Sequence, residues 1–169
     1  MRILSIDYGK KRTGIAVTDP LQIIAGGLAT VSTSELFNFL NGYIAKELVE
    51  LVVIGEPKQT NGQPSENMQR VRGFVGRWKK EHPDIPIVYY DERFTSVMAH
   101  RTMLDAGLKK KARQDKALVD EISATIILQS YLESRRRQSN DNVNDNDNDN
   151  DNDNDNDNKE VKVNVPVNV

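Results

Sequence analysis

The segment RILSIDYGKKRTGIAVTD, residues 2–19, contains two runs of apolar and β-branched residues separated by a basic turn. Alternation of apolar and polar residues over 2–8, and again over 13–18, is typical of β-strands, and Gly9–Arg12 supply a turn between them. The segment therefore predicts a β-hairpin at the start of the fold. Its first strand ends near a single carboxylate, Asp7, which is the first candidate for a functional site.

Composition divides the chain of 169 residues into a folding part and a tail. From Ser139 onward the sequence alternates Asp with Asn and ends in KEVKVNVPVNV. Such a segment has too little apolar surface to offset the entropy lost on ordering it. We therefore expect one folded domain over residues 1–138 and a disordered, Asp/Asn-rich, low-complexity tail over residues 139–169.

The two parts also differ in charge. The whole chain has a net charge of −2, whereas the first 140 residues carry 21 Lys and Arg against 16 Asp and Glu. A modestly basic domain is compatible with nucleic-acid binding, although many soluble domains have a similar charge. The absence of cysteine excludes disulfides and thiolate metal sites. No apolar run has the length of a signal peptide or of a membrane span, which predicts a cytoplasmic protein without membrane contact.

Beyond the hairpin, the pattern alternates strands with helices. It predicts a third strand near 23–31, followed by a helix over 32–48. The apolar runs LVVIG and IPIVYYD predict two further strands, each leading to a helix, near 65–81 and 95–105. A hairpin followed by strand–helix repeats predicts an α/β fold of three layers, with a five-stranded mixed sheet flanked by helices.

The last part of the domain is predicted to be a basic loop and a long helix. The Gly-containing segment AGLKKKARQDK is interpreted as a mobile loop, and a helix is predicted over Lys116–Arg137. The side chains expected on one face of that helix are Leu118, Ile122, Thr125, Ile126, Gln129 and Leu132. Two small residues, Ser123 and Ala124, leave room for the helix to approach the sheet.

Three acidic positions fall where this topology brings distant segments together. Asp7 ends the first strand, Asp91 and Glu92 end the last strand, and Asp120 lies near the start of the final helix. Ligands of open α/β sheets bind outside the carboxyl ends of the strands, so these carboxylates are expected to face one crevice. Crowded carboxylates raise one another's pKa, and a hard divalent cation such as Mg²⁺ or Mn²⁺ removes that cost. The pattern predicts a centre of one or two metal ions suited to phosphodiester cleavage.

Each acid taken alone has a simpler explanation. A single Asp at a strand end is more often a turn former or a helix cap than a catalytic group. Asp91 would then cap the following helix, and Asp120 would be a solvated helix residue paired with Lys116. The hypothesis of a metal centre depends on the three positions together.

Basic residues accompany all three acidic positions. Lys10 and Arg12 follow Asp7 in the sequence, and Arg93 follows Glu92. A further cluster precedes Asp120 and consists of Lys109, Lys110, Lys111 and Arg113. These side chains are candidates for binding nucleic-acid phosphates, although runs of charge are usually solvated surface.

Four motifs in this order resemble the YqgF family, also called RuvX, of Holliday junction resolvases and pre-16S rRNA nucleases. They are DYGKKRTGIAVTD, VVIGEPKQTNGQPSE, YYDERFTS and LVDEISATIILQSYL. The resemblance implies an RNase H-like fold, divalent-metal-dependent hydrolysis of nucleic-acid phosphodiesters, and maturation of the 5′ end of 16S ribosomal RNA in ribosome biogenesis. It implies that Asp7, Glu92 and Asp120 are the catalytic, metal-binding acids. The resemblance assigns no role to Asp91, and Glu56 departs from the apolar residue that is common at its position in the family.

Three alternative functions follow from the same motifs. The DYG turn also looks like the phosphate-binding hairpin of the actin, Hsp70 and sugar-kinase superfamily, but the foldable residues are too few for the two domains that this fold needs. A four-way DNA junction would replace RNA in a resolvase, and junction-resolving relatives work as homodimers. A non-catalytic RNA-binding factor of ribosome assembly would retain the fold and the basic residues. Carboxylates at all three positions favour a nuclease.

Overall fold

The computed structural model describes residues 1–59, 61, 63, 65–91 and 95–147. The elements in chain order are β1 (Arg2–Tyr8), β2 (Arg12–Thr18), β3 (Ala25–Ser32), the short 3₁₀ helix η1 (Thr33–Glu35), α1 (Leu36–Ile44), β4 (Val49–Glu56), α2 (Met68–Glu81), β5 (Ile87–Asp91), α3 (Thr95–Asp105), α4 (Lys110–Arg113) and α5 (Lys116–Asp147). The chain divides into two units between Arg135 and Arg136, and the fold described below is that of the first unit.

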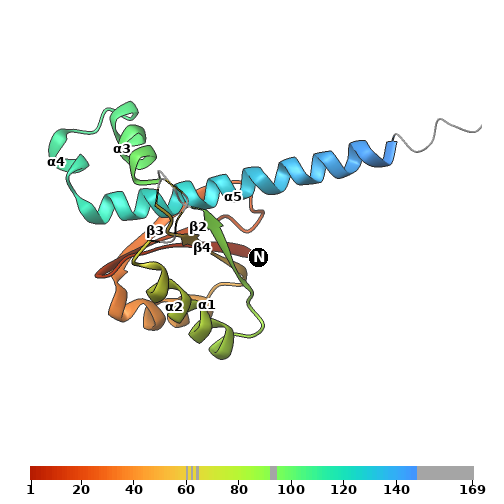
Figure 1. Ribbon diagram of the computed structural model, residues 1–169, viewed down its shortest axis with the longest axis horizontal. Coiled ribbons are helices and arrows are strands. Elements are labelled where there is room, and N and C mark those ends of the chain that lie inside the picture. Colours follow the sequence, from red (N-terminus) through yellow and green to blue (C-terminus); the bar gives the residue numbers. More distant parts are fainter. Residues whose placement is uncertain (60, 62, 64, 92–94, 148–169) are drawn as a thin grey trace, which may run out of the picture. The chain divides into compact units, whose positions relative to one another are not determined.

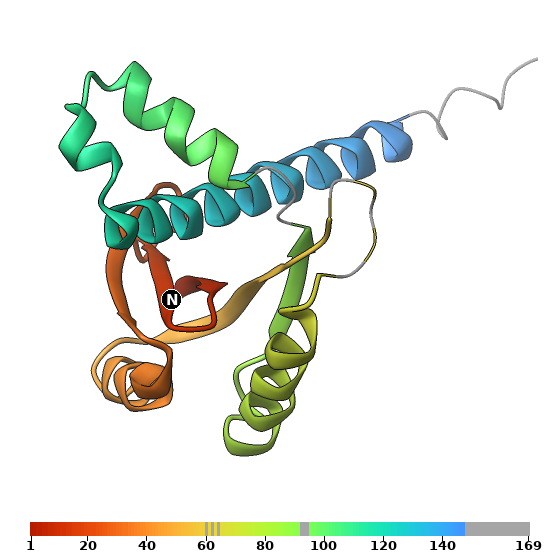
Figure 2. The ribbon, with the colours of Figure 1, turned by 60° about the vertical axis from the view of Figure 1, so that its left-hand side comes forward.

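One five-stranded sheet has the strand order β3-β2-β1-β4-β5. β1 pairs antiparallel with β2, and β2 pairs antiparallel with β3, which confirms the predicted hairpin start. β4 pairs parallel with both β1 and β5. Helices α1 and α2 lie on one face of this sheet and α5 crosses the other (Figures 1 and 2). The predicted three-layer α/β fold with a mixed sheet is therefore confirmed.

Side chains of the sheet alternate between two hydrophobic cores, one on each face. Leu4 and Ile6 of β1 belong to the α1/α2 core, which also contains Trp78 and Phe74 of α2. Ile3, from the same strand, belongs to the α5 core. The α5 core is completed by Ala16, Ala25, Val53, Ala124, Ile127, Leu128 and Leu132. Because successive strand residues point to opposite faces, the side of Asp7 follows from that of Ile3.

The segment between α3 and α5 differs from the predicted loop, since it contains the single helical turn α4. Gly107 has a φ of 71°, and the N–H groups of Gly107 and Leu108 donate to carbonyls of the last turn of α3. This is a glycine C-cap, which ends α3 and leaves room for a new turn. Asp115 then accepts the N–H of Ala117 at 3.0 Å and so caps the start of α5.

Helix α5 also differs from its prediction in length and in its buried face. It ends at Asp147 rather than Arg137, because extending an existing helix avoids the cost of nucleation even through poor helix formers. Gln129, predicted to share one face with Leu132, is exposed, whereas Leu132 belongs to the α5 core. Ala124 packs in that core, as its predicted role in the approach to the sheet requires, together with Ile127 and Leu128. None of the helices in the described part of the chain has the length and hydropathy of a membrane span.

Candidate active site

Helix α5 crosses the antiparallel half of the sheet with its backbone in contact with the strands. The Thr30 hydroxyl of β3 donates to the carbonyl of Ala117 at 2.6 Å, and the Ser5 hydroxyl of β1 donates to the carbonyl of Ala124 at 2.5 Å. Between them, on β2, a Cβ atom at Gly14 would overlap the backbone carbonyl of Asp120. The helix therefore passes over β3, β2 and β1 in turn, and the absence of a side chain at Gly14 permits its closest approach.

This crossing brings the predicted acids Asp7 and Asp120 to the same place. Gly14 is the direct partner of Asp7 in the β1–β2 pair. Directly opposed residues of an antiparallel pair point to the same face, with Cα atoms about 4.5–5.5 Å apart. Asp7 lies two residues after Ser5 in β1, so its side chain points to the same face as that of Ser5, which contacts α5. Asp7 and the backbone of Asp120 therefore both adjoin Gly14 on the α5 face, although 113 positions separate the two residues in the sequence.

Asp120 forms an ion pair with Arg12, the first residue of β2. The Nε atom of Arg12 lies 2.9 Å from Oδ2 of Asp120, and both side chains are partly exposed. The alternative pairing of Asp120 with Lys116 is therefore not the contact that forms. A partly exposed ion pair adds little to stability, but a charged hydrogen bond to Oδ2 fixes the orientation of the carboxylate.

The third acidic position is only partly described. Glu92 and Arg93 lie outside the described residues. Asp91 is paired in register with Glu56 at the end of β4. Tyr90 belongs to the α5 core, so alternation directs Asp91 to the opposite face of the sheet. There Nζ of Lys58 lies 3.1 Å from Glu56 and 3.9 Å from Asp91. Asp91 and Glu56 therefore belong to a separate charged cluster and do not face Asp7.

The side chains of Asp7 and Asp120 suit a hard divalent cation, because Mg²⁺ and Mn²⁺ prefer carboxylate oxygen. Within the described residues, no three His, Cys, Asp or Glu side chains are grouped closely enough to hold a metal ion. The structure thus describes two of the three predicted ligands. The small residues at the crossing of α5 and β2 leave the two carboxylates at the edge of the α5 core, where neither is fully buried.

Two cavities lie in the region around α4 and the start of α5. The first, of about 410 Å³, adjoins the ion pair and is lined by Arg12, His100, Arg113, Gln114, Lys116, Val119 and Asp120. Nε of Arg113 is buried and has no hydrogen-bond partner among the described residues. His100 and Lys116 were not predicted as site residues, because neither belongs to a recognisable motif.

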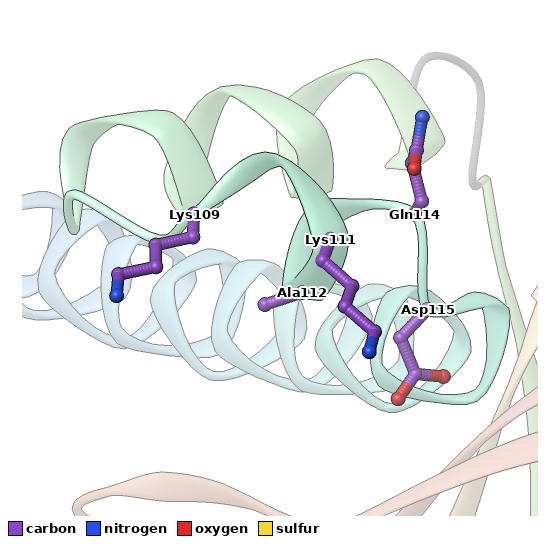
Figure 3. Close-up of a pocket in the computed structure, with 5 residues that line it drawn as sticks. All are labelled: Lys109, Lys111, Ala112, Gln114 and Asp115. Atoms are coloured by element: carbon purple, nitrogen blue, oxygen red, sulfur yellow. The ribbon is translucent and has the colours of Figure 1, made fainter.

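The second cavity, of about 600 Å³, is lined by Lys109, Lys111, Ala112, Gln114 and Asp115 (Figure 3). Lys111 and Asp115 point to the same side in this view, and Gln114 points away from them. Four of the predicted phosphate-binding residues therefore line these cavities. Arg12 and Arg113 line the one that includes Asp120, and Lys109 and Lys111 line the other. Lys10 lies elsewhere, on the exposed β1–β2 turn, and Lys110 is an exposed residue of α4.

The chain is also similar in sequence to known proteins of one family. The family model described as RuvX: Holliday junction resolvase matches residues 1–134. A protein of Bacteroides thetaiotaomicron named "Putative pre-16S rRNA nuclease" is 67% identical over 135 residues, which cover 80% of this chain and 98% of that protein. A protein of the same name from Flavobacterium johnsoniae is 63% identical, with the same coverage.

Among solved structures, the chain resembles "T. thermophilus RuvC in complex with Holliday junction substrate". The TM-score is 0.50 at 18% sequence identity, and the match covers 80% of this chain and 96% of that one. Similarity at this level of identity bears on the fold, and it confirms the predicted RNase H-like architecture.

Proposed function

Because the chain belongs to the RuvX family, we propose that it is a divalent-metal-dependent nuclease that processes the 5′ end of precursor 16S ribosomal RNA. The observation that carries this proposal is the close approach of the Asp120 backbone in α5 to Gly14, the cross-strand partner of Asp7. No requirement of folding explains two acids from opposite ends of the domain at one crossing. Ribosomal RNA as the substrate also implies that the protein acts in the cytoplasm.

Asp7, Glu92 and Asp120 would hold one or two Mg²⁺ or Mn²⁺ ions. When bound, such an ion activates the attacking water and stabilises charge on the leaving oxygen. Arg12 orients the Asp120 carboxylate through its ion pair. Hydrolysis adds the oxygen of water to phosphorus and breaks the bond to the 3′ oxygen, which takes up a proton. The products carry a 5′-phosphate and a 3′-hydroxyl.

The cavity beside Asp120 supplies the groups that hold the substrate. Arg113 and Lys116 present positive charge there, and Nε of Arg113 has no partner within the described residues. Phosphates next to the scissile bond would bind these side chains, and those further along the strand would meet Lys109 and Lys111. Arg93 keeps its predicted phosphate-binding role, although it lies outside the described residues.

The test is cleavage of precursor 16S rRNA, and separately of a four-way DNA junction, in Mg²⁺ and in Mn²⁺. Asp7→Asn and Asp120→Asn should each reduce cleavage at least about a thousandfold, because each removes a metal-binding charge. Asp91→Asn is the matched control, since it makes the same chemical change on the opposite face and should cleave like the wild type.

Each outcome of this test discriminates between the functions considered. Equal cleavage by wild type and Asp7→Asn would contradict the proposal and indicate a contaminating nuclease. Cleavage of the junction alone would change the substrate to DNA. RNA binding by the wild type without cleavage in either metal would favour the non-catalytic assembly factor.

A further inference from the structure

A third cavity, of about 400 Å³, lies on the face of the sheet opposite the two acids. Its lining includes Tyr8 of β1, Phe37 of α1 and Arg70 and Arg77 of α2. Tyr8 directly follows Asp7 in β1, so the two side chains point to opposite faces at the same end of the strand. The Tyr8 ring packs against Phe74 at a centroid distance of 5.4 Å, which fixes it on the α2 side. This cavity and Asp7 therefore lie on opposite faces of the sheet, at the same end of β1.

The groups that line the cavity suit a nucleotide. Arg70 is exposed, and neither its guanidinium nor the Tyr8 hydroxyl has a hydrogen-bond or ion-pair partner in the described part of the chain. Arg77 lies over the Phe37 ring, 3.8 Å from its centroid, and its Nε is bonded to Glu81. A guanidinium held against a ring presents its outer surface for stacking a base, while an unpaired guanidinium binds phosphate.

The space between the two arginines is open. Gly73 lies one helical turn from each of them on α2 and also lines the cavity. A Cβ atom added at Gly73 would meet nothing within 4 Å. A ligand can therefore lie along the helix between the phosphate-binding group and the stacking group.

A rigid basic turn connects this cavity with the acids. The β1–β2 turn carries the exposed residues Lys10 and Lys11. Its backbone is fixed from the cavity side, because Thr33 donates its hydroxyl to the Gly9 carbonyl at 2.7 Å and Asn67 donates to the Tyr8 carbonyl at 2.6 Å. The basic side chains of Lys10 and Lys11 therefore lie on the turn between the face of the acids and the cavity at Arg70.

We propose that the cavity at Tyr8 and Arg70 binds a nucleotide of the same RNA strand that is cut at Asp7 and Asp120. The strand passes over the β1–β2 turn from one face of the sheet to the other. This inference rests on the proposed nuclease function and adds a second, separate contact with the substrate. It also gives Lys10 and Lys11 a role in holding the strand where it crosses the edge.

The experiment measures binding of a fluorescein-labelled single-stranded RNA to the full chain by fluorescence anisotropy, in EDTA to prevent cleavage. Arg70→Ala should weaken binding at least about fivefold, because it removes a charged phosphate contact. The slope of log affinity against log salt should fall by about 0.7, the value for one phosphate contact with a single strand. Tyr8→Phe should weaken binding less than Arg70→Ala, because it removes one neutral hydrogen-bonding group and keeps the ring.

Arg72→Ala is the matched control. Arg72 is an exposed arginine of the same helix, and it lies near Tyr89, where its charge opposes the rise in the Tyr89 pKa that burial causes. It does not line the cavity. Its removal changes the net charge as Arg70→Ala does, and we expect a loss of affinity of less than about twofold.

Equal losses in Arg70→Ala and Arg72→Ala would overturn the inference, since they would indicate diffuse electrostatic attraction. Unchanged affinity in both would also overturn it and leave the cavity to another kind of partner. If the wild type fails to cleave RNA in Mg²⁺ and Mn²⁺ but Arg70→Ala still binds more weakly than Arg72→Ala, the nuclease proposal fails and the RNA contact stands.

Discussion

The two faces of the sheet are filled in different ways. On the α1/α2 face, large rings fill the space, with Phe74 against Phe37 at 4.9 Å and Trp78 fully buried. On the α5 face, the contacts nearest the acids are made by small residues and by the helix backbone, as at Gly14 and Ala124. Large rings keep a helix away from a sheet, whereas small residues let its backbone reach the strands. The carboxylates are found on the face where the backbone approaches.

The buried rings that stabilise the fold and the acids proposed for cleavage therefore lie on different faces of the sheet. A buried aromatic cluster stabilises the fold by the apolar area that it removes from water, and charged groups contact it only at its exposed rim, as Arg77 does over Phe37. A helix that rests on glycine and serine leaves its polar side chains at the rim of the core. Substitutions of the buried rings on the α1/α2 face should therefore act mainly on unfolding, and substitutions at the α5 crossing should act mainly on cleavage.

The largest effect on stability is expected for Trp78→Ala. The indole is fully buried, and its N–H donates to the Ile85 carbonyl at 2.8 Å. Its removal should lower the free energy of unfolding by about 3–5 kcal/mol, measured by urea denaturation. Trp78→Phe keeps most of the buried area and should be affected less. A loss below about 1 kcal/mol for Trp78→Ala would contradict the view that this face stabilises the domain.

Gly14→Ala should have a smaller effect on unfolding and a larger one on cleavage. The new Cβ would overlap the Asp120 carbonyl, and a backbone atom within a helix cannot move aside by itself. Overpacking of this kind costs about 1–3 kcal/mol, and the resulting shift of α5 would move Asp120 relative to Asp7. The measurements are urea denaturation and cleavage of precursor 16S rRNA at a temperature where the variant is folded.

Two neighbouring glycines provide graded controls for that substitution. A Cβ at Gly27 would overlap the side chain of Glu121, which is flexible and can move, so Gly27→Ala should affect cleavage less. A Cβ at Gly26 would meet nothing within 4 Å, so Gly26→Ala should cleave like the wild type. If Gly26→Ala and Gly14→Ala lost equal activity, the close approach of α5 would not explain the loss.

Arg12→Ala should scarcely change stability but should impair cleavage. Its ion pair with Asp120 is partly exposed, so the free energy of unfolding should change by less than about 1 kcal/mol. Cleavage should fall at least about tenfold, because Asp120 loses the group that orients it. Arg12→Lys keeps the charge without the Nε contact, and activity restored by lysine would show that charge alone is sufficient.

The sequence predicts the sheet and the order of its elements, because strand alternation and turn residues are local signals. The buried face of α5 was predicted only in part. Ala124 and Leu132 pack in the α5 core as expected, but Gln129 is exposed. Ile127 and Leu128 belong to that core without having been predicted there. Apolar periodicity locates the most hydrophobic face of a helix, but small residues and backbone contacts decide which face packs on this sheet. That depends on Gly14 and Ser5, which are more than one hundred residues away.

The same limit applies to the site. The ion pair of Arg12 with Asp120 joins residues 108 positions apart, and no local pattern indicates it. His100 carries no spacing signal either, and only the folded chain places it beside Asp120. By contrast, strand register and alternation give a relation that the sequence alone does not show, since Asp91 is paired with Glu56 on the face opposite that of Asp7.

The smallest effect is expected at the opposite end of β2, where Asp19 organises the turn into β3. Its carboxylate accepts the N–H groups of Leu21, Ile23 and Ile24, and these bonds, that of Ile24 foremost, lower the pKa of Asp19. A lowered pKa in the folded state means that the ionised carboxylate stabilises the fold above its unfolded pKa. That contribution is lost as the pH falls through the folded pKa.

Asp19→Ala should therefore lower the free energy of unfolding slightly at neutral pH, and the difference from wild type should shrink in acid. Urea denaturation of both proteins at neutral pH and below the folded pKa of Asp19 measures this, with cleavage at neutral pH as a second readout. Because Arg12 begins β2 and Asp19 follows its last residue, Thr18, the two residues are far apart along the strand, and cleavage should be unchanged. A pH-independent loss of stability would mean that Asp19 acts by packing rather than by its charge, and a loss of cleavage would mean that the two ends of the hairpin are coupled.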